Sequence, residues 1–128
     1  MIPDSVTSIG DHAFDGCSSL TSVYITDLEA WCNIKFSSNF LANPLCYANN
    51  LYLNGSLVKD LVIPDSVTSI GDHAFDGCSS LTSVTFEDIK NWSVVISSGK
   101  KKKMNVKNVS KNATNLTQNY CGNEWIKE

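Results

Sequence analysis

Two histidines beside acidic residues are the first groups whose types and spacing could do chemistry. His12 and His73 each lie in the stretch Gly-Asp-His-Ala-Phe-Asp-Gly, with one carboxylate directly before the imidazole and another three residues after it. Such a group could bind a metal or transfer a proton. The stretch occurs twice, however, and a catalytic residue has no reason to recur in each unit of a repeat. We therefore predict that both histidines are surface residues of short helices.

The five cysteines include neither a Cys-x-x-Cys pair nor a Cys/His cluster with zinc spacing. Cys17 and Cys78 occupy equivalent positions of a repeat, which indicates a packing role. Cys32, Cys46 and Cys121 lie outside it, and a disulfide among them stays open at this point. The repeated serines lack the setting of a nucleophile, such as Gly-x-Ser-x-Gly. We predict no catalytic residue, no cofactor and no metal site.

Basic charge is concentrated near the C-terminus. Residues 1–89 carry 2 lysines against 11 acidic residues, and residues 90–128 carry 8 lysines against 2. The run Lys100–Lys103 could attract polyanions such as glycosaminoglycans, but a solvated hairpin tip is the preferred interpretation. The chain has no arginine, the residue that usually recognises phosphate and guanine. We expect no nucleic-acid partner and, with no tract of about 18 apolar residues, no membrane insertion.

A long internal duplication determines the elements that position these residues. The stretch IPDSVTSIGDHAFDGCSSLTSV occurs as Ile2–Val23 (the first copy) and again as Ile63–Val84 (the second copy). Apolar residues recur every three or four positions, but Pro3 and Gly10 interrupt any single helix. The pattern predicts a solenoid, in which the chain turns repeatedly around one core. Because the chain opens inside the repeat, we expect a piece of a longer protein without its own N-terminal cap.

Each coil is expected to combine a strand, a turn and a short helix. The pattern Leu-x-x-Leu-x-Leu, typical of leucine-rich-repeat strands, fits 20–25, 58–63 and 81–86. A helix is predicted over 73–78, beginning at Asp72 and ended by a positive φ at Gly77, with Ala74, Phe75 and Cys78 buried.

Beyond the identical block, Thr26–Trp31 aligns with Glu87–Trp92. Both are predicted to be short helices with an inward Leu28 or Ile89 and an inward tryptophan. Between the copies, Pro44–Ala48 is predicted to be a helix with proline at its first position, and Asn54-Gly55 a hairpin turn.

Both copies resemble the BspA-like leucine-rich repeats, in which IP-x-x-V-x-x-I-x-x-x-A-F-x-x-C-x-x-L-x-x-V is the characteristic unit. The expected fold is an α/β repeat: a leucine-rich-repeat solenoid with short parallel strands, short helices and a C-terminal capping segment. Residues 1–98 would form the repeats, as a 61-residue duplication with an insertion at 39–57. Residues 99–128 would form a basic hairpin and the cap, which is anchored by Leu116, Tyr120, Trp125 and Ile126.

The resemblance implies a non-catalytic protein-interaction or adhesion module, extracellular or on a bacterial cell surface. It also implies a host or microbial surface protein as the partner, matrix proteins included. We expect the chain to act as a monomer. Two alternatives are a carbohydrate-binding module, which paired exposed aromatics would favour, and a structural spacer, which a featureless face would favour. The predicted binding face consists of the outward residues of the strands: Thr21, Ser22, Tyr24, Lys59, Asp60, Val62, Thr82, Ser83 and Thr85.

Overall fold

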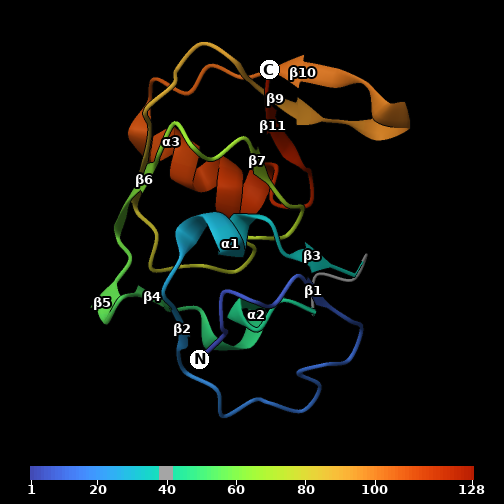
Figure 1. Cartoon of the computed structure of the whole chain (residues 1–128), viewed down its shortest axis with the longest axis vertical. Coiled ribbons are helices and arrows are strands. Elements are labelled where there is room, and N and C mark those ends of the chain that lie inside the picture. Colours follow the sequence, from blue (N-terminus) through green and yellow to red (C-terminus); the bar gives the residue numbers. More distant parts are fainter. Residues whose placement is uncertain (38–41) are drawn as a thin grey trace.

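Two stacks of short strands lie on opposite sides of the chain, with α1, α2 and α3 between them (Figure 1). This architecture is seen in a computed structural model, which describes residues 1–37 and 42–128. Part of the predicted insertion at 39–57, residues 39–41, lies outside the described residues. No closed sheet is formed by the described strands, so the fold is an open repeat with short parallel strands and short helices, as predicted.

The first stack contains the predicted leucine-rich-repeat strands. β2 (Val23–Ile25) pairs in parallel with β4 (Leu51–Leu53), which turns back at Asn54-Gly55 into β5 (Ser56–Leu57). β6 (Asp60–Ile63) pairs in parallel with β8 (Ser83–Phe86). Alternate residues of β6 and β8 are buried, because successive side chains of a strand point to opposite faces.

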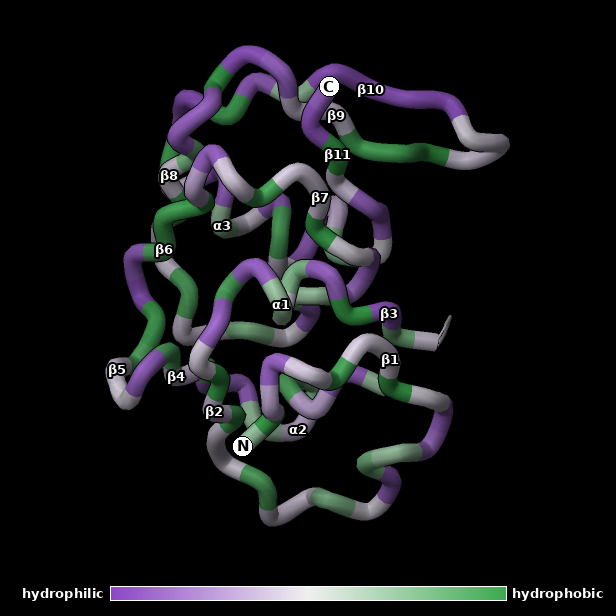
Figure 2. Tube along the Cα trace, viewed as in Figure 1, coloured by the Kyte–Doolittle hydropathy of each residue, from purple (hydrophilic) through white to green (hydrophobic). Residues whose placement is uncertain are grey.

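The second stack is built partly from the C-terminus. β1 (Ser8–Ile9) pairs in parallel with β3 (Lys35–Phe36). β7 (Ser69–Ile70) pairs antiparallel with β11 (Trp125–Lys127). On its other side β11 pairs antiparallel with β9 (Trp92–Val95), and β9 pairs antiparallel with the edge strand β10 (Lys101–Lys103). In Figure 2, β10 is hydrophilic along its length, whereas β9 beside it is apolar.

The helices are short, and polar side chains cap the N-termini of α1 and α3. α1 (Leu28–Cys32) is capped by Asp27, whose carboxylate accepts a hydrogen bond from the Ala30 N–H at 3.2 Å. α2 (Leu45–Ala48) follows Pro44. α3 (Val109–Thr114) is capped by Asn108 and continues into the π-helix η3 (Asn115–Asn119), while a 3₁₀ turn, η2 (Ser97–Gly99), joins β9 to β10.

Two predicted helices are wrong. Residues 73–78 form successive turns, because His73 has a φ of 65° and the hydrogen bonds span three residues rather than four. The predicted burial of Ala74, Phe75 and Cys78 and the positive φ of Gly77 are confirmed. Residues 87–92 form no helix either: β9 begins at Trp92, and the predicted inward residue Ile89 is 42% exposed.

The two identical copies differ in burial. In the second copy, Ile63, Val67, Phe75, Cys78 and Leu81 are all buried. The equivalent residues of the first copy are only half-buried. That copy lies at one end of the molecule, where one of its sides faces solvent. Their shared sequence therefore does not give them a shared environment. The half-buried residues of the first copy are Ile2, Val6, Phe14, Cys17 and Leu20.

The junction between residues 1–57 (the first unit) and residues 58–128 (the second unit) is made by both backbone and side-chain hydrogen bonds. The Gly71 N–H donates to the Cys32 carbonyl oxygen at 2.8 Å. Trp31, which is 1% exposed, donates its indole N–H to the carbonyl oxygen of Ala74 at 2.9 Å. The fully buried Asn43 donates to the same carbonyl at 3.1 Å and to that of His73 at 2.5 Å, while its own oxygen accepts from the Leu45 N–H at 2.9 Å. Among the described strands, none pairs across this junction.

Candidate functional site

The outward residues of β2, β4, β6 and β8, with the residues just before β2, β6 and β8, form one side of the molecule, here called the parallel-strand face. Its predicted members that precede the strands are Thr21, Ser22, Lys59 and Thr82. Five of its predicted members are exposed polar residues, and two, Ser22 and Ser83, are half-buried. The two apolar or aromatic members are both prominent: Tyr24 is 43% exposed and Val62 is 50% exposed. The exposed polar members are Thr21, Lys59, Asp60, Thr82 and Thr85.

Tyr24 has an aromatic partner that the sequence analysis missed. In the parallel register of β2 and β4, Tyr24 lies beside Tyr52, and the two rings stack with centroids 4.8 Å apart and planes 24° apart. Leu51-Tyr52-Leu53 has the same apolar-Tyr-apolar order as Val23-Tyr24-Ile25, and this is the signal that could have revealed the pair. Stacking also leaves the two facing ring surfaces covered by each other.

A groove of about 440 Å³ separates the β4–β5 hairpin from β6 on this face. Val58 completes the hairpin by donating its N–H to the Leu51 carbonyl at 2.8 Å, and β6 begins two residues later. On the far side of β6, Ser83 donates to the Asp60 carboxylate at 2.6 Å. The groove is therefore open between two separately paired sheets, and it is lined by Leu53, Ser56, Leu57, Val58, Lys59, Asp60, Leu61 and Val62.

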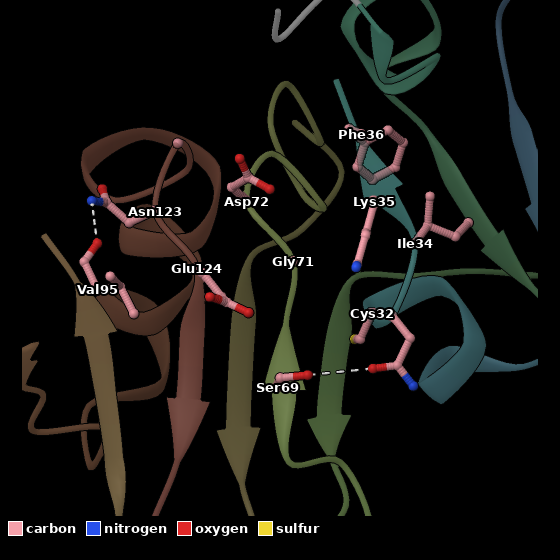
Figure 3. Close-up of a pocket in the computed structure, with 12 residues that line it drawn as sticks. Cys32, Ile34, Lys35, Phe36, Ser69, Gly71, Asp72, Val95, Asn123 and Glu124 are labelled. Atoms are coloured by element: carbon pink, nitrogen blue, oxygen red, sulfur yellow. Dashed lines mark hydrogen bonds between the residues drawn. The ribbon is translucent and has the colours of Figure 1, made fainter. Parts of the chain in front are cut away.

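A second cavity, of about 540 Å³, opens on the opposite side between β3, β7 and the turn before β11 (Figure 3). Its charged lining residues are Lys35, Asp72 and Glu124. Cys32 also lines the cavity, and burial, aided by nearby Glu29 and Asp27, raises the pKa of its thiol to about 12. A neutral, buried thiol is a poor nucleophile, so this cavity has no activated group of that kind.

The histidines lie in similar turns but differ in exposure. His12 is exposed, with its Nδ1 atom 2.7 Å from the Asp15 carboxylate. The ring of His73 is largely buried, with its Nδ1 atom 3.0 Å from Asp76, so the predicted surface position is wrong for this copy. The predicted helix is wrong for both copies, since residues 11–16 also form turns. Each imidazole is paired within its own turn. In the part of the chain that the structure describes, no group of three or more His, Cys, Asp or Glu could hold a metal ion.

Cys17, Cys32, Cys78 and Cys121 are free thiols in this structure. Burial is the largest cause that raises the pKa of Cys46, to about 11, and it also raises the pKa of Cys78 and Cys121. These thiols are therefore protonated at neutral pH. The buried position of Cys78 agrees with its predicted packing role, whereas Cys17 in the first copy is only half-buried.

The basic run Lys101–Lys103 lies along β10, at the edge of the second stack. Lys101 forms an ion pair with Glu128, and Lys102 donates to the hydroxyl of Tyr120 at 2.7 Å. Lysines on an edge strand also discourage pairing with another chain. No described helix is long and apolar enough to cross a bilayer.

The comparison with protein families gives one match. Residues 1–44 and 47–120 match the family model described as "BspA type Leucine rich repeat region (6 copies)". No curated protein and no solved structure matches the chain.

Proposed function

Because the chain belongs to the BspA-type leucine-rich repeats, whose repeats are generally non-catalytic and bind proteins, we propose that it is a non-catalytic protein-interaction and adhesion module. Repeats of this type are typical of surface proteins, which supports an extracellular or cell-surface location on a bacterium. The partner proposed is a host or microbial surface protein, matrix proteins included. The chain would act as a monomer.

The observation that carries this proposal is the pair of aromatic and apolar anchors on the parallel-strand face. Tyr24, stacked on Tyr52, lies at one side of the face, and the half-exposed Val62 borders the groove beside it. Protein interfaces depend on a few such residues, surrounded by polar groups that contribute less to affinity. The exposed threonines together with Lys59 and Asp60 would provide the polar surroundings.

A carbohydrate-binding module is the second candidate, because Tyr24 and Tyr52 are paired aromatics at a surface. Their geometry gives this candidate weaker support. The rings stack on each other at 4.8 Å, so their facing surfaces cannot both receive a sugar. A structural spacer is the third candidate, and the exposed Tyr24 and Val62 count against a featureless face.

We further propose that residues 99–128 close the C-terminal end of the solenoid. Leu116 and Trp125 are buried, and Tyr120 and Ile126 are half-buried, as expected for the anchors of a cap. Trp125 stacks on Phe86 of the second unit, with centroids 5.8 Å apart. The boundary at residue 98 is part of this proposal.

A binding assay on the whole chain tests the proposed function. The chain would be immobilised and exposed to a panel of purified matrix proteins and to a soluble protein of matched charge. We expect selective binding to at least one matrix protein, and a loss of about tenfold or more for the double variant Tyr24→Ser with Val62→Ser. Val109→Ser is the matched control, because Val109 is 40% exposed and is not one of the residues of this face.

Three other outcomes would reject the proposal. Binding to no matrix protein would favour the structural spacer over the protein-interaction module. Binding to neutral glycans alone, lost in Tyr24→Ser, would establish the carbohydrate-binding module. An equal loss of binding in Val109→Ser would show that the anchors are not on the parallel-strand face.

A further inference from the structure

Three lysines from a strand and a nearby helix line one groove, here called the lysine groove. Lys102 and Lys103 come from β10, and Lys111 comes from α3. The groove has a volume of about 470 Å³. Among its described lining residues there is no acidic side chain: they are Lys102, Lys103, Met104, Asn105, Lys111, Asn115, Asn119 and Tyr120.

The positive charge of the lysine groove is not neutralised from within the described part of the chain. No carboxylate lies within 4.0 Å of the ammonium groups of Lys103 or Lys111. Lys102 is held against Tyr120, with its Nζ atom 2.7 Å from the hydroxyl and 5.2 Å from the ring centroid. Neither contact removes its charge. Concave sites lined by one sign of charge concentrate the field and attract ions of opposite sign.

Protection of a sheet edge explains only part of this arrangement. It accounts for lysines on β10, which is the edge strand of its sheet. It does not account for Lys111, which lies on a helix and borders the same groove. Nor does it account for Asn119 and Tyr120, which place an amide and a phenol beside the ammonium groups.

The remaining lining residues indicate the class of ligand. Met104 is the one large aliphatic side chain among the described lining residues, and it is buried, so the groove presents no exposed aliphatic anchor for a peptide. Its aromatic residue, Tyr120, is half-buried and is contacted by Lys102. Lysine ammonium groups act as point charges toward sulfate or carboxylate. The amides of Asn105 and Asn119 can both donate to and accept from hydroxyl groups. Anionic groups and hydroxyls occur together, at short intervals, along acidic polysaccharides.

We propose that the lysine groove binds an acidic polysaccharide, with Lys102, Lys103 and Lys111 contacting its sulfate or carboxylate groups. The site lies in the C-terminal segment, shares no lining residue with the parallel-strand face, and does not depend on the proposed protein partner. A chain with both surfaces could hold a protein and a glycan at once.

Titration of the whole chain with three polysaccharides tests the proposal: a heparin-derived oligosaccharide, a polyuronate without sulfate, and neutral dextran. We expect binding to at least one of the acidic chains and none to dextran, with affinity falling as sodium chloride is raised from about 50 to about 300 mM. The two acidic probes tell sulfate from carboxylate as the preferred group. The double variant Lys103→Gln with Lys111→Gln should bind about tenfold or more weakly.

The matched control is Lys90→Gln, which removes an equally exposed lysine of the same basic segment outside the groove. It should keep at least half of the wild-type affinity. Equal losses in Lys90→Gln and the groove variant would overturn the proposal, as would tighter binding to anionic lipid vesicles or to DNA than to both acidic probes. Absence of binding to both probes would also overturn it. Tyr24→Ser should bind the polysaccharide normally, which separates this test from that of the protein-binding face.

Discussion

Trp31 of the first unit donates its indole N–H to the carbonyl oxygen of Ala74 in the second unit, over 2.9 Å. Both residues are 1% exposed, so this hydrogen bond joins the two units in the core rather than at the surface. The amide of Asn43 reaches the same oxygen. The carbonyl thus has two side-chain donors from the first unit, and the turn that replaces the expected helix at 73–78 is held by them.

Asn43→Ala should destabilise the chain by about 1–3 kcal/mol, because it removes a donor from the part-buried carbonyl of His73 and from the buried carbonyl of Ala74, and the acceptor of the Leu45 N–H. Urea unfolding followed by circular dichroism would measure the change. Asn91→Ala, an exposed asparagine, should change the free energy of unfolding by less than about 0.5 kcal/mol. Equal changes in the free energy of unfolding for the two variants would show that the hydrogen bonds of Asn43 do not stabilise the junction.

Gly71→Ala should be far more damaging than Gly10→Ala, although the two glycines are equivalent in the two copies. A Cβ atom on Gly71 would lie 2.7 Å from the Ile34 carbonyl oxygen and 3.3 Å from that of Cys32, whereas nothing lies within 4 Å of one on Gly10. Both close atoms belong to the backbone and cannot rotate away. We expect a loss of about 2 kcal/mol or more for Gly71→Ala and under about 1 kcal/mol for Gly10→Ala, measured by thermal unfolding. A loss of the same size in both variants would contradict the close approach.

Phe75→Ala should cost about 3–5 kcal/mol, because the ring is 1% exposed and its removal leaves a cavity in the core. The same substitution at the equivalent Phe14 should cost clearly less, since that ring is only half-buried. The neighbours in sequence are identical, so the difference between the two variants reports the environment alone. Chemical unfolding of both variants side by side measures it, and equal costs would mean that the first copy is as well packed as the second.

Cys32→Ser should flatten the fall in stability at alkaline pH. Burial raises the pKa of Cys32 in the folded chain from 9.0 to about 12, so the folded state holds this proton more tightly than the unfolded state. The resulting stabilisation is complete below pH 9 and is lost as the pH rises toward 12, at up to about 1.4 kcal/mol per pH unit.

Comparing the free energy of unfolding of wild type and Cys32→Ser between pH 8 and pH 11 isolates this group, because other titrating residues are common to both. The difference between the two curves should be constant below about pH 9 and should narrow above it. Parallel curves over the whole range would show that the thiol does not remain protonated in the folded chain.

The leucine-rich-repeat strands could be predicted because their period of two is a local property of the sequence. Leu61 and Ile63 are buried and Val62 is exposed, as the alternation requires. The turn at Asn54-Gly55 and the positive φ of Gly77 could also be predicted, since residue types other than glycine and asparagine rarely adopt a positive φ.

The errors arose where a distant segment or an unusual φ decided the structure. Trp92 begins a strand because β11, more than thirty residues later, pairs with it, and the expected helix around Ile89 is lost. His12 and His73 both have φ near 65°, although the described hydrogen bond from the backbone N–H to the Cys121 carbonyl is made by His73 alone. Because both copies share the turn, it is a local feature of the repeat, and the helix-like composition of the segment conceals it. Tyr52 was missed because the sequence does not show which strands are neighbours, and the lysine groove because Lys111 reaches β10 only through the fold.

The interruption of both strand stacks at the same level has a mechanical consequence. Among the described strands, β3 and β5 end the ladders of the first unit, and β6 and β7 begin those of the second. Force applied along the long axis would therefore meet backbone ladders within each unit, but isolated hydrogen bonds, such as Trp31 to Ala74 and Gly71 to Cys32, between them. We expect the solenoid to behave as a chain of stiff segments joined by softer couplings, and an array of such units on a surface to yield stepwise under load while each segment keeps its shape.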